Sequence, residues 1–388
     1  MAFAGLRGTG DWAADERPKN FREMILWRNP NGTAPLTAFL AKMSSEAVND
    51  PEFAWWEEEL NVTRVIVNGV ITTTTTTSIV VTVNALELVP GDVLLIETSD
   101  ATTAEIVTVN AVTSDTAFDV IRGRAGTTAA AIPTGTGITK VGNVFAEGTL
   151  SPSVSNRNPT KIRNYTQIFK TAYQLTRTAK ATNTRTGDPL KNDKKRKMFD
   201  HSAALEMAFI FGKAFETTGA NGKPLRFTGG LREFISSNVT VFATTPTETT
   251  FINAVSPVFN YDGGGGNERI VFAGNGALTS LNKLAKAGMQ VRTDDVVKLY
   301  GMSLQRWIIP QGTFMFRTHP LLNNHPRYTN SMFILDPSAI IYRYITDTIP
   351  QNNIQAPDAD EEKGQWLTEC GLEFRHQKTM AYLGNFVV

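Results

Sequence analysis

The sequence predicts an α+β fold with a separate all-β small barrel or sandwich. Between residues 61 and 143, threonine and valine dominate and Phe118 is the only aromatic residue. Short apolar runs in this stretch are separated by turn dipeptides such as Asn68-Gly69 and Arg122-Gly123, which is typical of small all-β domains. After about residue 186, one long helical pattern is followed by alternating helix and strand patterns, which indicates an α+β body.

Length and composition limit the class of protein. The 388 residues exceed the roughly 250–300 at which a single hydrophobic core stops growing, so we expect at least two domains. Hydrophobic residues make up 41% and charged residues 19%, which excludes a disordered chain. The 38 basic and 37 acidic residues give a net charge of +1, so any contact with DNA must be local. The single Cys370 cannot form an internal disulfide.

The first 50 residues have the composition of an N-terminal arm. They are polar, are interrupted by glycine and proline, and show only short helical patterns over 21–27 and 36–43. Neither this arm nor the rest of the chain contains an apolar stretch suited to a signal peptide or a membrane span. We therefore expect no export and no membrane contact.

Several later segments predict strands. Residues 53–60 combine three aromatic rings with three glutamates, which predicts a strand with a solvated acidic end. The threonine tract 72–77 fits a strand edge or an exposed hairpin because threonine is β-branched, and no function is assigned to it. Residues 165–176 are rich in β-branched and aromatic residues and predict a long strand. Within the stretch 61–143, we expect strands at 62–70, 79–83, 93–97, 104–109 and 118–121.

A basic segment leads into the long helix. Residues 177–197 hold eight lysines and arginines against two aspartates, and the densest part is the basic patch Lys194, Lys195, Arg196 and Lys197. The helix is expected to begin near Pro189 and to end before Gly219. Its apolar stripe of Met198, Leu205 and Phe209 is expected to pack inward. Further helices are expected at 248–259 and 276–287, a loop at 263–266, and strands at 269–273, 304–310, 313–317, 332–335 and 340–344.

The motif search predicts no catalytic, cofactor-binding or metal-binding site. Gly263 to Gly266 leads into Asn267, without the lysine and hydroxyl of a phosphate-binding loop. The four histidines are scattered, and His319 and His325, each followed by proline, are interpreted as turn residues. We expect Cys370 to be a buried structural thiol and the acidic stretch 358–364 to be a solvated loop.

The order of these parts resembles a known architecture. An arm, an extended β region, a long helix with a basic start, an α+β body and returning strands follow one another as in the major capsid proteins of tailed double-stranded DNA phages, which share the Hong Kong ninety-seven fold. The likeness is to the group with a β domain inserted in the extended loop. The segments that carry it are RGRAGTTAA at 122–130, NVFAEG at 143–148, YTQIF at 165–169 with LTRTA at 175–179, 206–212, GGL at 229–231, and Phe234-Ile235.

The resemblance implies a function and a domain organisation. It implies a structural protein without enzymatic activity or cofactor, a major capsid protein that self-assembles as hexamers and pentamers into the icosahedral head around the genome, within the host bacterial cytoplasm. The implied partners are scaffolding, portal and decoration proteins, and packaged DNA through non-specific contacts. The implied domains are an N-terminal arm 1–50, an extended loop 51–60 and 144–185, an inserted β domain 61–143, a peripheral domain with the spine helix 186–235 and 340–388, and an axial domain 236–339.

Two expectations concern contacts with neighbours. The arm lacks the apolar periodicity to hold itself in place, so we expect it to dock onto neighbouring subunits through Trp12, Phe21, Trp27 and Leu36. Because residue 1 is methionine, we do not expect the arm to be the remnant of a cleaved scaffolding domain. The basic patch is expected to face the shell interior or an acidic neighbour, where contacts with DNA phosphates would weaken with salt.

Two other functions stay open at this point. The first is a tail or neck structural protein whose β domain binds a host glycan or another virion protein, and such a protein would form rings or tubes instead of shells. The second is a hydrolase with an appended β module. It would require converging carboxylates that the sequence does not reveal.

Overall fold

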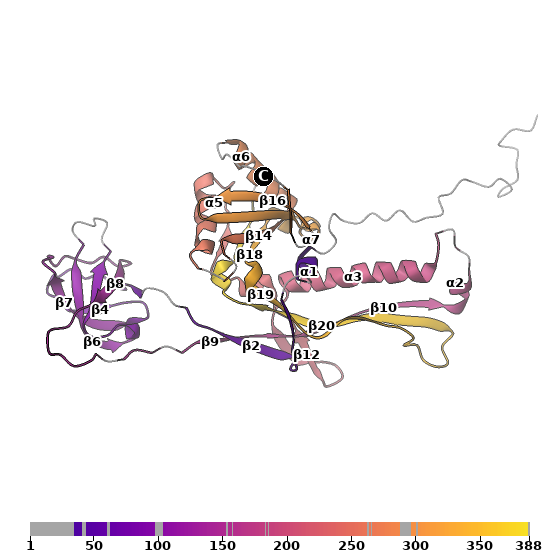
Figure 1. Ribbon diagram of the computed structural model, residues 1–388, viewed down its shortest axis with the longest axis horizontal. Coiled ribbons are helices and arrows are strands. Elements are labelled where there is room, and N and C mark those ends of the chain that lie inside the picture. Colours follow the sequence, from indigo (N-terminus) through magenta and orange to yellow (C-terminus); the bar gives the residue numbers. More distant parts are fainter. Residues whose placement is uncertain are drawn as a thin grey trace, which may run out of the picture. The chain divides into compact units, whose positions relative to one another are not determined.

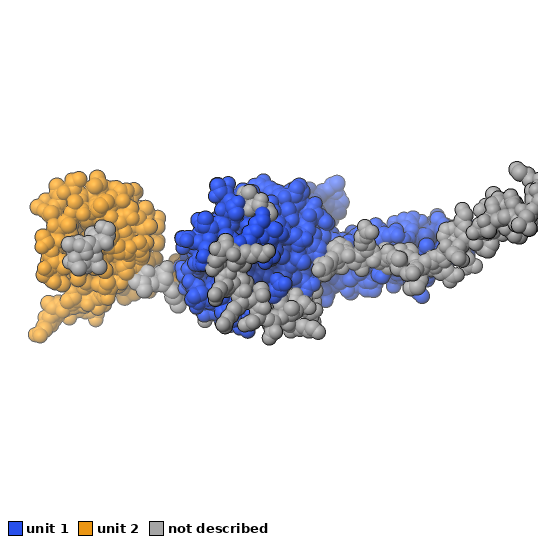
Figure 2. All heavy atoms as spheres, turned by 90° about the horizontal axis from the view of Figure 1, so that it is seen from above, with its two compact units in different colours: residues 1–55, 162–388 blue, residues 56–161 orange. Residues whose placement is uncertain are grey.

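The computed structural model divides the chain into two compact units (Figure 2). Unit 1 comprises Met1–Trp55 and Ile162–Val388, and unit 2 comprises Trp56–Lys161. The structure describes residues 35–40, 44–59, 63–97, 104–152, 154–156, 158–182, 184, 186–261, 264, 266–287, 296–299 and 302–386. The helix expected at 21–27 lies outside the described residues.

Unit 2 is a six-stranded barrel. Its strand order is β3-β8-β5-β6-β7-β4, and a bridge between Val67 and Val81 joins the first strand to the last. In this unit, sequence patterns miss strand β8, because its glycines and lysine hide the alternation of Ile138 and neighbouring residues. The elements are β3 (Arg64–Ile66), β4 (Ser78–Val80), η1 (Ala85–Glu87), β5 (Asp92–Ile96), β6 (Ile106–Ser114), β7 (Ala117–Arg124) and β8 (Gly137–Asn143).

The barrel has a hydrophobic core of its own, made of valine, isoleucine and leucine around the fully buried Phe118. Burial of this kind is the main favourable term in folding, and the unit is longer than many domains that fold alone. We therefore expect residues 56–161, expressed as a separate chain, to unfold in one cooperative thermal transition followed by circular dichroism. A random-coil spectrum without a transition would contradict this prediction.

Unit 1 places the long helix α3 (Pro189–Phe211) against a four-stranded sheet (Figure 1). The sheet order is β1 (Ser45–Ala47), β19 (Ile340–Gln351), β20 (Glu361–Phe374) and β10 (Gln167–Thr176). Asp188 caps the helix by accepting the N–H groups of Leu190 and Lys191 at 2.9 and 3.4 Å, and Pro189 occupies the first turn. The strand β10 and the helix lie close to the predicted positions.

A second, seven-stranded sheet forms the rest of the body of unit 1. Its order is β13 (Val239–Val241), β21 (Ala381–Gly384), β18 (Met332–Leu335), β14 (Glu268–Ala273), β17 (Gly312–Thr318), β16 (Met302–Ile309) and β15 (Val296–Leu299). Helices α5 (Glu248–Val255) and α6 (Asn275–Ala287) contribute to the same core. Because β21 pairs with β13 and β18, it belongs to this seven-stranded sheet. It is thereby separated from β19 and β20, which lie in the four-stranded sheet.

Shorter elements connect these layers. In the part of the chain that the structure describes they are α1 (Pro35–Leu40), β2 (Glu52–Glu57), β9 (Thr160–Tyr165), α2 (Arg177–Ala181), β11 (Phe215–Thr218), β12 (Pro224–Phe227), α4 (Leu231–Phe234), η2 (Ser256–Phe259), α7 (Pro320–Asn323), η3 (Tyr328–Asn330), η4 (Pro337–Ala339) and η5 (Gln377–Thr379). Strands β2 and β9 pair with each other, as do β11 and β12.

The long helix ends at Phe211 with Gly212 as its cap, before Gly219 as predicted. A Cβ on Gly212 would lie 2.3 Å from the Thr228 carbonyl oxygen, so only glycine fits at this cap. The helix differs from its prediction in one respect. Met198 is 36% exposed and does not belong to the inward stripe, whereas Leu205 and Phe209 do.

Candidate functional site

The buried face of α3 is joined to the four-stranded sheet by a histidine. His201 is fully buried, and its ring nitrogens lie 3.0 Å from Thr171 Oγ1 of β10 and 2.8 Å from Thr368 Oγ1 of β20. Burial lowers the pKa of His201, so the neutral ring is favoured. The ring therefore acts as a polar bridge that fixes the helix on the sheet.

The basic patch lies on the first half of α3 and makes contacts within its own chain. Lys194 Nζ lies 3.2 Å from Asn352 Oδ1 and over the ring of Tyr173. Arg196 and Lys197 pair with aspartates three residues away on the same helix, at 3.5 and 3.1 Å. Two aspartates therefore stand beside the four cations, and the patch keeps a net positive charge.

The acidic stretch 358–364 is not a free solvated loop. Strand β20 begins at Glu361, and Asp360 pairs with Arg177 at 2.6 Å, while Glu362 pairs with Lys180. The hydrogen bond from Lys180 to Glu362 raises the pKa of the lysine. These carboxylates thus neutralise the start of the basic segment, before the patch on α3.

The hairpin of β11 and β12 exposes an apolar face. Phe215 stands opposite Phe227, and Leu225 stands opposite Thr217, so the three large side chains share one face of the hairpin. Phe215, Leu225 and Phe227 are 59%, 46% and 40% exposed. On the other face, Arg226 Nε donates to Glu216 at 2.6 Å. An exposed apolar cluster with a polar opposite face is typical of a surface that contacts another protein.

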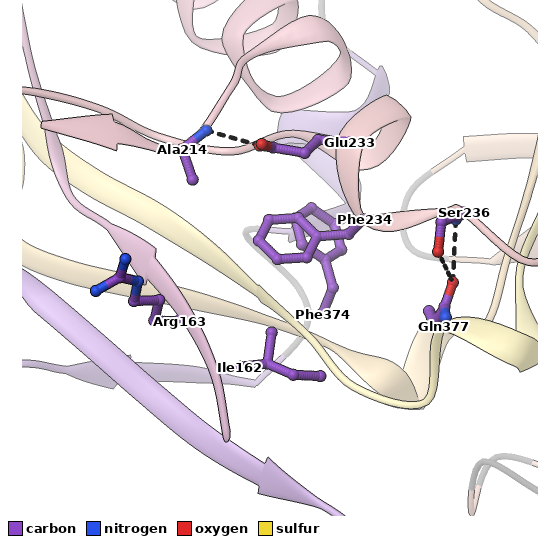
Figure 3. Close-up of a pocket in the computed structure, with 8 residues that line it drawn as sticks. All are labelled: Ile162, Arg163, Ala214, Glu233, Phe234, Ser236, Phe374 and Gln377. Carbon is purple, nitrogen blue, oxygen red and sulfur yellow. Dashed lines mark hydrogen bonds between the residues drawn. The ribbon is translucent and has the colours of Figure 1, made fainter. Parts of the chain in front are cut away.

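A pocket of about 330 Å³ opens beside this hairpin in unit 1 (Figure 3). Its floor contains the rings of Phe234 and Phe374, whose centroids are 4.9 Å apart. Two of its polar groups are used internally, because Glu233 accepts the N–H of Ala214 at 2.6 Å and Gln377 accepts hydrogen bonds from Ser236. The lining residue Arg163 lies 3.7 Å from Glu52. The pocket therefore offers an apolar hollow and not a catalytic arrangement.

Two residues that the sequence analysis placed on the surface or in a turn are buried in the structure. Leu36 is 1% exposed and packs in the core of its own chain, so it is not available to a neighbouring subunit. His319 is fully buried and bonded to Glu206, and is not a simple turn residue. Both corrections come from contacts with α3, which is distant in the sequence. Trp12, Phe21 and Trp27 lie outside the described residues.

The described residues contain little that supports chemistry. No group of three or more His, Cys, Asp or Glu among them is placed to hold a metal ion. Burial raises the pKa of Cys370 to about 12, so the thiol is an inert part of the core, as predicted. No described helix is both long and apolar enough to cross a membrane.

Comparisons with known proteins point to one family. The model of the SU10 major capsid protein family matches residues 6–386. The major capsid protein of Pseudomonas phage PaMx41 is 26% identical over 340 residues, covering 83% of this chain and 77% of that protein. A solved structure from Mycobacterium phage Bobi aligns over 96% of both chains with a TM-score of 0.50 and 9% identity. The capsid of Myoviridae phage XM1 aligns over 97% of this chain and 99% of that one, with a TM-score of 0.48 and 9% identity.

These matches confirm the resemblance inferred from the order of parts. The alignment with the Bobi structure shows a common fold, the phage major capsid fold, here with an inserted β barrel. Neither the family match nor the curated relative supports a tail or neck protein. Since the family model spans nearly the whole sequence and the relative is itself a major capsid protein, the chain belongs to the SU10 major capsid protein family.

Proposed function

We propose that this chain self-assembles, as hexamers and pentamers, into the icosahedral head that encloses the double-stranded DNA genome of a tailed phage. The observation that carries the proposal is the family match over residues 6–386. The chain acts as a structural component of the virion, without enzymatic activity or cofactor, and assembles in the cytoplasm of the host bacterium. One sequence occupies both kinds of capsomer, so its interfaces must tolerate slightly different environments.

The parts of the subunit are assigned as follows. The arm is 1–50, the extended loop is 51–60 and 144–185, and the inserted β domain is 61–143. The peripheral domain is 186–235 and 340–388, and the axial domain is 236–339. The location of β21 in the seven-stranded sheet supports moving Ala381–Gly384 to the axial domain.

The contacts with partners use different surfaces. The apolar face of the β11–β12 hairpin packs against a second copy of the chain, because a shell subunit must bury such side chains between copies. Trp12, Phe21 and Trp27 of the arm anchor it to neighbouring subunits. The basic patch faces the packaged DNA and contacts phosphates without reading sequence. Scaffolding, portal and decoration proteins are further partners of the assembled head.

Electron microscopy of the purified full-length protein tests the function. We expect closed shells with hexameric and pentameric capsomers in negative stain. Rings or open tubes as the exclusive product, at all protein and salt concentrations tried, would contradict the proposal and favour a tail or neck component.

Replacing Lys194, Lys195, Arg196 and Lys197 with glutamine is expected to weaken retention of DNA while shells still form. For each cation that no longer neutralises a phosphate, the slope of log affinity against log salt becomes shallower by about 0.9. The measurement is the DNA content of filled heads as the salt concentration rises. A control, Lys161→Gln with Lys170→Gln, removes exposed cations elsewhere and should not change it. Equal DNA retention in the patch variant and wild type would remove this role from the patch.

A further inference from the structure

A buried carboxylate joins three segments of unit 1 that are far apart in the sequence. Glu206 lies in α3 and is fully buried, and its Oε1 accepts the backbone N–H of Leu36 in α1 at 2.7 Å. The same oxygen lies 2.8 Å from Nε2 of His319, which follows strand β17 and is also fully buried. One oxygen atom therefore connects residues 35–40, the long helix and the turn into α7.

Burying the Glu206 carboxylate costs folding free energy unless each of its hydrogen bonds is kept. A buried carboxylate is stable only when hydrogen bonds replace the water that surrounded it in the unfolded chain. Around it, Leu36 and Leu40 pack in the same apolar cluster as Phe209 and Phe272, so water has little access. The His319 ring meets Phe272 edge-on at 5.8 Å, and its Nδ1 has no partner among the described residues. The imidazole is thus held mainly through Nε2 and its own backbone.

We propose that Glu206 is a latch that makes the docking of residues 35–40 and the seating of His319 on the long helix depend on each other. If Leu36 leaves, the carboxylate loses a donor and a covering side chain, and its bond with His319 is exposed to water. If the His319 imidazole is removed, the carboxylate that holds Leu36 is left with less compensation in an apolar environment. The two ends of the latch therefore stabilise each other through one oxygen atom.

In the shell assembly proposed above, the latch gives the arm a regulatory role. This regulatory role rests on the proposed function, whereas the latch itself does not. A neighbouring subunit that pulls residues 35–40 away would loosen the turn at His319, which carries α7 and the end of β17. Displacement of residues 35–40 would thereby alter the end of β17 in the seven-stranded sheet. The same coupling would let an altered seven-stranded sheet release the arm.

Hydrogen exchange followed by mass spectrometry on the unassembled full-length chain tests the latch. The main variant is His319→Phe, which keeps a flat aromatic ring at the position but removes the donor to Glu206. We expect the amides of residues 36–40 to exchange at least tenfold faster in this variant, although the substitution is not in the arm. The variant Glu206→Leu should accelerate exchange in both 36–40 and 319–323.

The control is Glu233→Leu, which removes a carboxylate that accepts a backbone N–H elsewhere in unit 1 and should leave both segments unchanged. Unchanged exchange at 36–40 in His319→Phe would overturn the coupling, and so would acceleration of only one segment in Glu206→Leu. If Glu206→Leu does not fold, His319→Phe alone decides. Because the readout needs no shells, failure of the latch and failure of the assembly function are separate results.

Discussion

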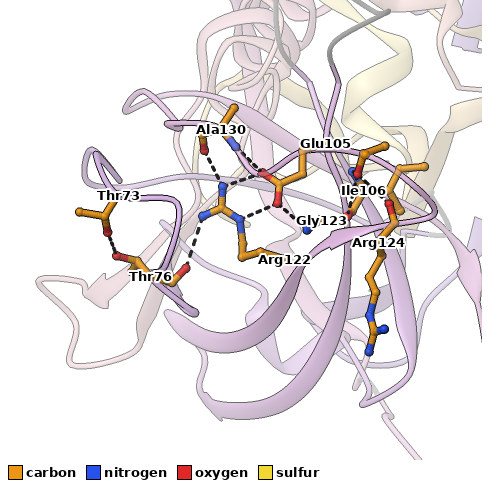
Figure 4. Close-up of polar contacts among 9 residues, drawn as sticks. Thr73, Thr76, Glu105, Ile106, Arg122, Gly123, Arg124 and Ala130 are labelled. Carbon is orange, nitrogen blue, oxygen red and sulfur yellow. Dashed lines mark hydrogen bonds and ion pairs between the residues drawn. The ribbon is translucent and has the colours of Figure 1, made fainter.

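The substitution Arg122→Met is expected to destabilise the barrel of unit 2 by about 3–5 kcal/mol, because it leaves a buried carboxylate without its partner. Arg122 and Glu105 form a bidentate pair at 2.7 and 2.6 Å, with side chains only 6% and 1% exposed (Figure 4). Glu105 also accepts the N–H groups of Gly123 and Ala130. Thermal and urea unfolding of residues 56–161 measures the decrease in stability.

The same unit offers a matched control on its surface. Arg64 and Glu97 also form a bidentate pair, but their side chains are 50% and 33% exposed. Hydrogen bonds from Arg64 and Thr139 lower the pKa of Glu97 to about 2, yet solvent screening keeps the stability of such a pair small. We expect Arg64→Met to cost about 0–1 kcal/mol. Equal destabilisation in the two variants would contradict the argument that burial decides the effect.

The buried pair of Arg122 and Glu105 also predicts how the barrel responds to acid. Burial by itself raises the pKa of Glu105, but the hydrogen bonds from Arg122, Gly123 and Ala130 outweigh it and hold the pKa below its ordinary value of 4.5. A carboxyl whose pKa is lowered on folding stabilises the fold above its unfolded pKa and loses that contribution as pH falls. The melting temperature of wild-type 56–161 should therefore decrease between about pH 4.5 and 2. Glu97 contributes over the same range, because folding lowers its pKa from 4.5 to about 2.

The double variant Phe215→Ser with Phe227→Ser is expected to raise the subunit concentration needed for shell assembly at least tenfold. Burying one such side chain contributes about 1.5–3 kcal/mol, and every 1.4 kcal/mol corresponds to a factor of about ten in affinity. Both rings are exposed in the single chain, so its free energy of unfolding should change by only about 0.5 kcal/mol for each substitution. Light scattering against protein concentration, with electron microscopy, measures assembly.

The opposite face of the same hairpin supplies the control. Arg226→Gln removes the pair with Glu216 but keeps the apolar face intact, so assembly should stay within about threefold of wild type. Assembly of the double serine variant at the wild-type concentration would show that this face is not an interface between copies. A large effect in both variants would instead indicate that the hairpin as a whole had been disrupted.

Local patterns in the sequence were sufficient for the long helix and for strands such as β5 and β18, but not for others such as β20, at whose start a solvated loop was expected. Asp188 and Pro189 signal the start of the long helix, and strand β18 occupies the four residues that its apolar run predicts. Such signals work because capping and alternation depend on neighbours within a few residues. Strand β8 was missed because its glycines and lysine obscure alternation, and its place in the barrel comes from pairing with β3 and β5.

By itself, the sequence determined the class of fold, the inserted β domain, the basic patch and the likeness to phage capsid proteins, since these rest on composition, short-range patterns and the order of parts. Only the tertiary structure decided the role of His319 and Leu36, which meet Glu206 across 113 and 170 residues of sequence. It alone also paired Arg122 with Glu105 and placed three apolar side chains on one open face of a hairpin. The physical reason is that burial and partnership are set by which segments pack together, and a side chain's own neighbours in sequence do not specify them.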